Sequence, residues 1–250
     1  MRSRVPSPAR PGAGHPTALA FAAVVAGVAS VATLASPALA QRAGSSALDR
    51  AVATYAHVAT MRGTFEQTLT NPLTGTSAVA RGEFVQERPS HLDVRFTDPS
   101  GDRIVADGRW VWVYVPSATP GQVMRVPVNE ARSGGGGGTV SVDFISQLLT
   151  DPTARFTVTG EHPDTVGNRQ TTAVTLQPRD PGDQITRATL WIDAEGVVRQ
   201  FEVTDASGTA RRIRLLTEAF NGRVDRSAFA FRPPPGVKVV DQSGLIDGAG

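Results

Sequence analysis

The residue types that most often perform chemistry are sparse in this chain and poorly spaced for it. Cysteine is absent, which excludes disulfides, zinc–thiolate sites and a cysteine nucleophile. His57, His91 and His162 follow neither H-x-H nor H-E-x-x-H spacing, so we expect no metal ligation. No G-x-S-x-G nucleophile motif occurs, and the five glycines at 134–138 are not followed by the Lys-Ser/Thr of a phosphate-binding loop. We therefore expect a protein that is not an enzyme, with no catalytic residues, no metal and no cofactor.

Carboxylates do not change this expectation, because they cluster in turns. Asp98, Asp102, Asp107, Asp180 and Asp183 lie beside Gly or Pro, where Asp is favoured for local hydrogen bonds to the backbone. Nothing in their spacing supports a general-acid/base pair. The informative residues are instead apolar ones.

Apolar residues alternate with polar ones along several segments, which predicts strands with one buried face. Leu92, Val94 and Phe96 share one face of a strand, and similar sets are Leu190 with Ile192 and Ile213 with Leu215. These inward sets fit two structures: a sealed sandwich core, or a hydrophobic cavity beneath a helical lid. The pattern alone does not separate the two.

The first forty residues form a leader with the organisation of a secretory signal peptide. It contains Arg2, Arg4 and Arg10 but no acidic residue, then an apolar stretch over 18–35, and it closes on Ala38-Leu39-Ala40. A transmembrane anchor is the competing interpretation. Cleavage before Gln41 removes three arginines and leaves 22 basic against 23 acidic residues, so the formal charge changes from +2 to −1. The basic balance therefore gives no argument for nucleic-acid binding, and we expect a signal peptide over 1–40 and a single domain over 41–250.

The elements that follow alternate between helix and strand runs. The spacing predicts a helix from Leu48 to Ala59 with Ser46 as N-cap, and a second over 140–149 that ends at Asp151-Pro152. Strands are expected on both sides of that second helix, including 154–160 and a last one over Ala228–Phe231 before a short tail. We count about eleven strands and two helices without a parallel βαβ rhythm. The expected fold is mainly β (α+β), with an antiparallel sheet curled over the helices.

Four motifs, spread in order along nearly all of the mature chain, resemble those of the LolA family, the periplasmic carriers of outer-membrane lipoproteins. They are Phe65-x-Gln67, then Gly82-x-Phe84 with Arg88-Pro89, then Asp107-Gly108 with Trp112-x-Tyr114-x-Pro116, and finally Phe229-x-Phe231-x-Pro233-Pro-x-Gly236-Val237. The resemblance implies an incomplete antiparallel β-barrel of about eleven strands with a short helical lid over an apolar cavity. We expect that cavity to be lined by Phe65, Phe84, Leu92, Val94, Phe96, Trp112, Tyr114, Phe144, Leu148, Leu190, Ile213 and Leu215. The glycine run beside the second helix is longer than the resemblance leads us to expect.

The resemblance also implies a transport cycle. A soluble monomer in the periplasm would accept triacylated lipoproteins from an inner-membrane ABC transporter and pass them to a possible outer-membrane receptor, with no nucleic acid involved. Arg88 of the Arg88-Pro89 pair would bond the lid in the closed, empty form. Three alternatives stay open: a related half-barrel glycolipid carrier, an envelope-stress lipid sensor, and a structural envelope protein with a sealed core.

Overall fold

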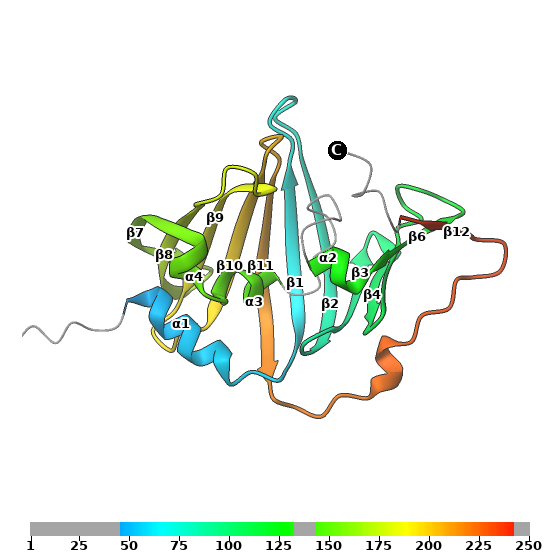
Figure 1. Ribbon diagram of the computed structural model, residues 1–250, viewed down its shortest axis with the longest axis horizontal. Coiled ribbons are helices and arrows are strands. Elements are labelled where there is room, and N and C mark those ends of the chain that lie inside the picture. The colour runs from blue at the N-terminus through cyan, green and yellow to red at the C-terminus, as the bar shows by residue number, and fades with distance from the viewer. Residues whose placement is uncertain (1–45, 133–143, 243–250) are drawn as a thin grey trace, which may run out of the picture. The chain divides into compact units, whose positions relative to one another are not determined.

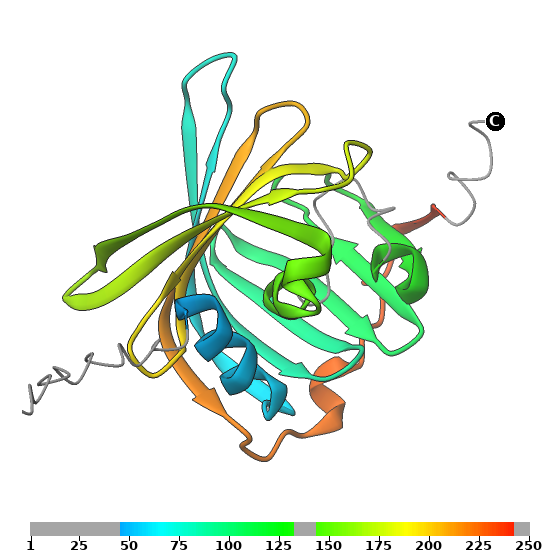
Figure 2. The same ribbon diagram turned by 60° about the vertical axis from the view of Figure 1, so that its left-hand side comes forward.

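A single twelve-stranded sheet dominates the structure, a computed structural model that describes residues 46–132 and 144–242. Figure 1 shows the sheet from one side, and Figure 2 shows it curving around the helices. Its order is β12-β6-β5-β4-β3-β2-β1-β11-β10-β9-β8-β7. Neighbouring strands are antiparallel except β12, which pairs in parallel with β6. The expectation of a mainly β fold with a long, open, antiparallel sheet is confirmed.

The strands differ in length, and the longest are β1, β2 and β11 at the centre of the sheet and β7 at its edge, with 11 residues each. Their bounds are β1 Thr60–Thr70, β2 Ser77–Glu87, β3 His91–Asp98, β4 Ser100–Asp107, β5 Trp110–Tyr114, β6 Gln122–Pro127, β7 Phe156–Val166, β8 Arg169–Pro178, β9 Ile185–Ile192, β10 Val198–Asp205, β11 Ala210–Phe220 and β12 Lys238–Asp241. The β1–β2 hairpin extends well past its neighbours (Figure 2), and its turn exposes Leu73.

Short helices lie between these strands, and within the described residues they are more numerous than expected. They are α1 Ala47–Ala56, α2 Val128–Arg132, α3 Phe144–Leu149, α4 Pro152–Arg155 and the 3-10 helix η1 Arg226–Phe229. The glycine run at 134–138 and the start of the expected second helix lie outside the described residues. No described helix has the length and apolar character needed to cross a membrane.

One expectation about the second half of the chain is wrong. Residues 226–229 form η1 rather than a strand over Ala228–Phe231, because the Asp225 side chain accepts a hydrogen bond from the Ser227 N–H and starts a helical turn. The short tail contains β12, which adds to the edge of the sheet beside β6. The second helix ends before Asp151-Pro152 as expected, because α3 finishes at Leu149. Pro152 then begins the short helix α4, where a proline at the first turn has no backbone bond to lose.

The core lies on the concave face of the sheet and consists of two main clusters of buried side chains. One cluster joins α1 and α3 to β1, β2 and β8–β11, and the other joins α2 to β3–β6. Gly82 on β2 allows a close approach within the first cluster. A Cβ at Gly82 would lie 2.9 Å from the Phe65 ring, so only glycine lets that ring pack across the neighbouring strand.

Candidate functional site

The site begins with α1, whose start is set by its own sequence. The Ser46 side chain accepts a hydrogen bond from the Asp49 N–H at 3.1 Å, and the Asp49 carboxylate accepts one from the Ser46 N–H at 3.3 Å. Ser46 is therefore the N-cap that the spacing predicts, and Asp49 completes a capping box. Leu48, Ala51 and Tyr55 on one side of the helix are buried. Helix α1 therefore packs with its apolar side against the concave face of the sheet (Figure 2).

Helix α3 lies beside α1 and covers the same apolar cluster. Ile145, Leu148 and Leu149 are buried, as expected for one side of a short amphipathic helix. Residue Phe144 begins α3, but its side chain lies outside the described part of the chain. Ser146 is half-buried, and its hydroxyl is oriented toward the end of β2.

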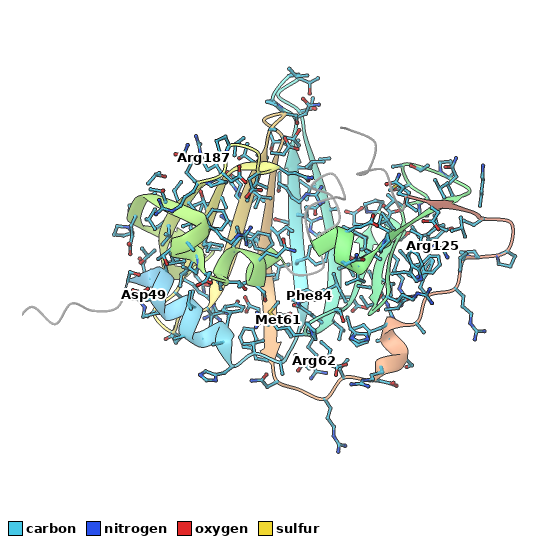
Figure 3. The ribbon with its side chains drawn as sticks, viewed as in Figure 1. Asp49, Met61, Arg62, Phe84, Arg125 and Arg187 are labelled. Carbon is cyan, nitrogen blue, oxygen red and sulfur yellow. The ribbon has the colours of Figure 1, made fainter. Side chains whose placement is uncertain are left out.

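Beneath these two helices the sheet brings together most of the apolar residues expected at a lipid site. Phe65, Phe84, Leu148, Leu190 and Leu215 are buried in the first cluster, and Val94, Phe96 and Ile213 pack against it half-buried. The Phe65 ring lies 5.6 Å from Phe96 and 6.4 Å from Phe84, centroid to centroid. Leu92 belongs to the second cluster, which also contacts Val94. Figure 3 shows Phe84 near Met61, at the end of the sheet where α1 finishes.

Trp112 and Tyr114 lie on the other face of the sheet, so their placement in this lining is wrong. Strand β5 is apolar on both faces, and its Val111 and Val113 take the concave face. The Trp112 and Tyr114 rings instead lie tilted against Phe231, with centroids 5.6 and 6.1 Å from its ring. Because successive side chains alternate across a strand, Trp112 and Tyr114 must lie on the outer face once Val111 and Val113 occupy the concave face.

The indole of Trp112 is held on that outer face by Asp107. Its Nε1 donates to Asp107 Oδ2 at 2.9 Å, and the Trp110 and Arg109 N–H groups donate to Oδ1 at 2.7 and 2.9 Å. Partial burial acts to raise the pKa of Asp107. The three donated hydrogen bonds and the charge of His91 outweigh it and keep the pKa below its ordinary value.

Arg88, at the end of β2, connects the sheet to both helices. Its Nη1 donates to the Tyr55 carbonyl of α1 at 2.7 Å, and its Nη2 donates to the Ser146 hydroxyl of α3. The Arg88 N–H also donates to the Ala59 carbonyl at 2.9 Å, which fixes the backbone beneath the side chain. Pro89 follows through a cis peptide bond and is exposed. One guanidinium thus bridges the two helices that cover the apolar cluster.

A buried group of charges beside α1 escaped the sequence analysis. Arg199 donates to Asp193 at 2.6 Å and to Glu218 at 2.6 Å, and all three side chains are at most 13% exposed. Burial raises the pKa of Glu218 above its ordinary value even though the Arg199 guanidinium opposes that shift. Asp193 also accepts from the Val197 N–H at 2.8 Å and so shapes the β9–β10 turn. The turn residues around Gly196 were the available signal, but they do not indicate which charges meet.

The same turn presses against α1. Thr54 donates its hydroxyl hydrogen to the Glu195 carbonyl at 3.0 Å. Gly196 has φ +80°, and a Cβ there would lie 2.6 Å from the Arg50 carbonyl oxygen. These contacts attach α1 to the sheet independently of Arg88.

Among the described residues no three His, Asp or Glu side chains gather in a way that could hold a metal ion.

Known outer-membrane lipoprotein carrier proteins are similar in sequence to this chain over most of its length. The family model "Outer membrane lipoprotein carrier protein LolA" matches residues 56–134 and 138–232. The gap between the two matched ranges falls within the glycine run. An outer-membrane lipoprotein carrier protein of Halorhodospira halophila is 28% identical over 187 residues, covering 75% of this chain and 82% of that protein. The carrier protein of Alkalilimnicola ehrlichii is 27% identical over 227 residues, covering 90% of this chain and 96% of that protein.

Solved structures are similar at lower identity. A putative outer membrane lipoprotein-sorting protein domain from Vibrio parahaemolyticus is 13% identical, with a TM-score of 0.40 over 73% of this chain and 95% of that one.

Proposed function

The chain belongs to the LolA family of outer membrane lipoprotein carrier proteins, and we propose that it holds the acyl chains of a lipoprotein against its concave sheet face, beneath α1 and α3. It is a non-enzymatic carrier that acts in lipoprotein localisation. The proposed lining consists of Phe65, Phe84, Leu92, Val94, Phe96, Leu148, Leu190, Ile213 and Leu215.

The observation that carries this proposal is the bridge made by Arg88. Three elements distant in sequence, the ends of α1 and β2 and the middle of α3, meet at one guanidinium. Breaking the bonds that it makes to Tyr55 and Ser146 would free α3 to move, because α1 has separate attachments through Thr54 and Gly196. Half-buried Val94, Phe96 and Ile213 would then become accessible to an acyl chain.

The energetics of acyl burial indicate how such a carrier must be loaded. Each buried methylene contributes about 0.8 kcal/mol, so eight of them contribute roughly 6 kcal/mol. A membrane offers the same chain at least as much, and the sequence contains no Gly-Lys-Ser/Thr phosphate-binding motif. We therefore propose an inner-membrane ABC transporter as the partner that loads the carrier, and an outer-membrane receptor as the partner that unloads it.

Members of the family are periplasmic. For this chain we propose that the leader over 1–40 is a signal peptide, cleaved before Gln41, and that 41–250 is one monomeric carrier domain. N-terminal sequencing of the protein from a periplasmic extract should begin at Gln41. Retention of Met1 in a membrane pellet would contradict both the cleavage and the soluble-carrier function.

Native mass spectrometry of residues 41–250 tests the function directly. We expect a 1:1 complex with a triacylated peptide and none with the same peptide lacking acyl chains. A glycolipid of similar acyl length serves as the comparison ligand, and preferential binding of it would favour a glycolipid carrier instead. Failure to take up either lipid or an apolar fluorescent probe would indicate a sealed core.

A further inference from the structure

The concave face becomes polar toward the end of β11 that begins at Ala210. Arg211 pairs with Val203 of β10 and Leu69 of β1, and Gln67 pairs with Ile213 two positions further along. Directly paired residues share a face of the sheet, and Val203 belongs to the buried cluster beneath α3. Arg211 and Gln67 therefore lie diagonally next to each other on the same face as the apolar lining.

Neither side chain forms a hydrogen bond or ion pair with any part of the chain that the structure describes. The neighbouring arginines of β11 behave differently on the opposite face. Arg212 pairs with Glu202 at 2.7 Å, and Arg214 pairs with Glu66 at 2.9 Å. Burial lowers the pKa of Arg211, and the charge of Asp205 opposes that shift only in part. Within the described part of the chain, the Arg211 cation on this apolar face therefore lacks an acidic partner of the kind that Arg212 and Arg214 have on the outer face.

Burial along the strand indicates where a ligand could reach. Leu215 and Phe65 are buried, whereas Ile213, Arg211, Gln67 and Leu69 are only half-buried. Arg211 lies four residues from Leu215, roughly 13 Å along an extended strand. An acyl chain packed near Leu215 would therefore place its polar end beside Arg211 and Gln67.

The chemistry of these two side chains selects the ligand group. A guanidinium has five N–H donors and no acceptor, and a glutamine amide adds two donors and one acceptor. The polar end of an acylated cysteine carries two ester carbonyls and one amide carbonyl, all of them hydrogen-bond acceptors. We propose that Arg211 and Gln67 form a polar subsite that binds the ester and amide carbonyls of the acyl chains and so sets how deeply they enter. This subsite rests on the carrier function proposed above.

Ester carbonyls also occur in phospholipids, so the test needs three ligands. They are a triacylated peptide without net charge, phosphatidylglycerol, and an alkyl fluorescent probe that has no carbonyl. Binding by Arg211→Leu and Gln67→Leu is compared with wild type and with Arg212→Leu, which changes the adjacent arginine on the outer face. Arg211→Lys keeps the charge but loses the planar fork.

We expect Arg211→Leu to weaken triacylated-peptide binding about tenfold and Gln67→Leu several-fold, with probe binding unchanged in both. Arg212→Leu should bind like wild type, and Arg211→Lys should recover part of the loss. Because the guanidinium has no partner among the described residues, Arg211→Leu should melt at the same temperature as wild type or higher, whereas a structural role would lower the melting temperature.

Equal weakening for peptide and probe, or wild-type affinity for the peptide, would overturn the subsite. If Arg211→Leu loses only phosphatidylglycerol binding, then Arg211 binds the lipid phosphate rather than an ester carbonyl, and the subsite is again overturned. If wild type itself binds none of the three ligands, it is the carrier function that fails. The two failures are therefore distinguishable.

Discussion

Replacing Arg88 with leucine should convert the carrier into one that holds its cargo and releases it poorly. Among the described residues, the guanidinium bonds to both helices, at the Tyr55 carbonyl and the Ser146 hydroxyl. Hydrogen bonds to charged groups contribute about 1.5–3 kcal/mol each. Because Arg88 is half-buried, we take the lower end, about 3 kcal/mol for both, which corresponds to roughly 100-fold in the closed-to-open ratio.

Loss of these bonds should leave the fold intact. The Tyr55 carbonyl also accepts from the Val58 N–H at 3.2 Å, so removal of Arg88 does not leave it without a donor. The open form is the one that binds lipid, and its low population weakens the apparent affinity of the wild type. Arg88→Leu removes that penalty, so loading stays intact while the re-formed bonds no longer help to expel the cargo.

The assay is transfer of a bound triacylated lipoprotein to acceptor liposomes, together with hydrogen exchange of the α3 amides in the empty protein. Arg88→Leu should release cargo much more slowly and should exchange its α3 amides faster, by up to about 100-fold. Arg88→Lys should recover part of the release. Arg81→Leu is the matched control, because Arg81 lies on the same strand but pairs with Glu66 at 2.8 Å outside the site. Wild-type transfer and exchange rates in Arg88→Leu would refute the bridge as a switch.

Three further changes test other parts of the structure. Gly196→Ala should lower the free energy of unfolding by about 1–3 kcal/mol in a urea titration, because φ at this position is +80° and the new Cβ would lie 2.6 Å from the Arg50 carbonyl oxygen. An unchanged urea midpoint would contradict the close packing of α1 against this turn. Asp107→Asn should lower stability at pH 7 by about 1 kcal/mol. Because the folded-state pKa of Asp107 is lowered, its carboxylate stabilises the fold above its unfolded-state pKa, and this stability is lost as the pH falls through the folded-state pKa. The melting temperatures of wild type and Asp107→Asn should therefore converge as the pH is lowered. A gap between them that stays constant with pH would contradict a role for the Asp107 charge. Val94→Glu should reduce lipopeptide binding more than it reduces the melting temperature, with Val79→Glu, at an exposed position, as control; outright unfolding would favour a sealed core.

Local signals in the sequence were sufficient for much of the fold. The capping box at Ser46 and Asp49, the period of two in Leu92, Val94 and Phe96, and the missing catalytic spacings all depend on residues within a few positions of one another. Such patterns determine where a helix begins and which residues share a face. The expectation that Arg88 bonds the lid came instead from the family resemblance, because no local pattern indicates it.

Tertiary structure decided the features that depend on which distant segments pair. Strand β5 is apolar on both faces, so its pattern could not say whether Val111 or Trp112 faces the core, and the contact with Phe231 on one face and α2 on the other settled it.

The same reason applies to the charged residues of β11. Arg211 and Arg212 are adjacent and chemically identical in the sequence, yet one lies among the apolar residues and the other pairs with Glu202 on the outer face. Side-chain direction in a strand follows from register, and the register of β11 is set by its pairing with β1, about 150 residues earlier in the chain. Local sequence contains no information about that pairing, so only the assembled sheet separates an arginine of the candidate site from an arginine of the surface.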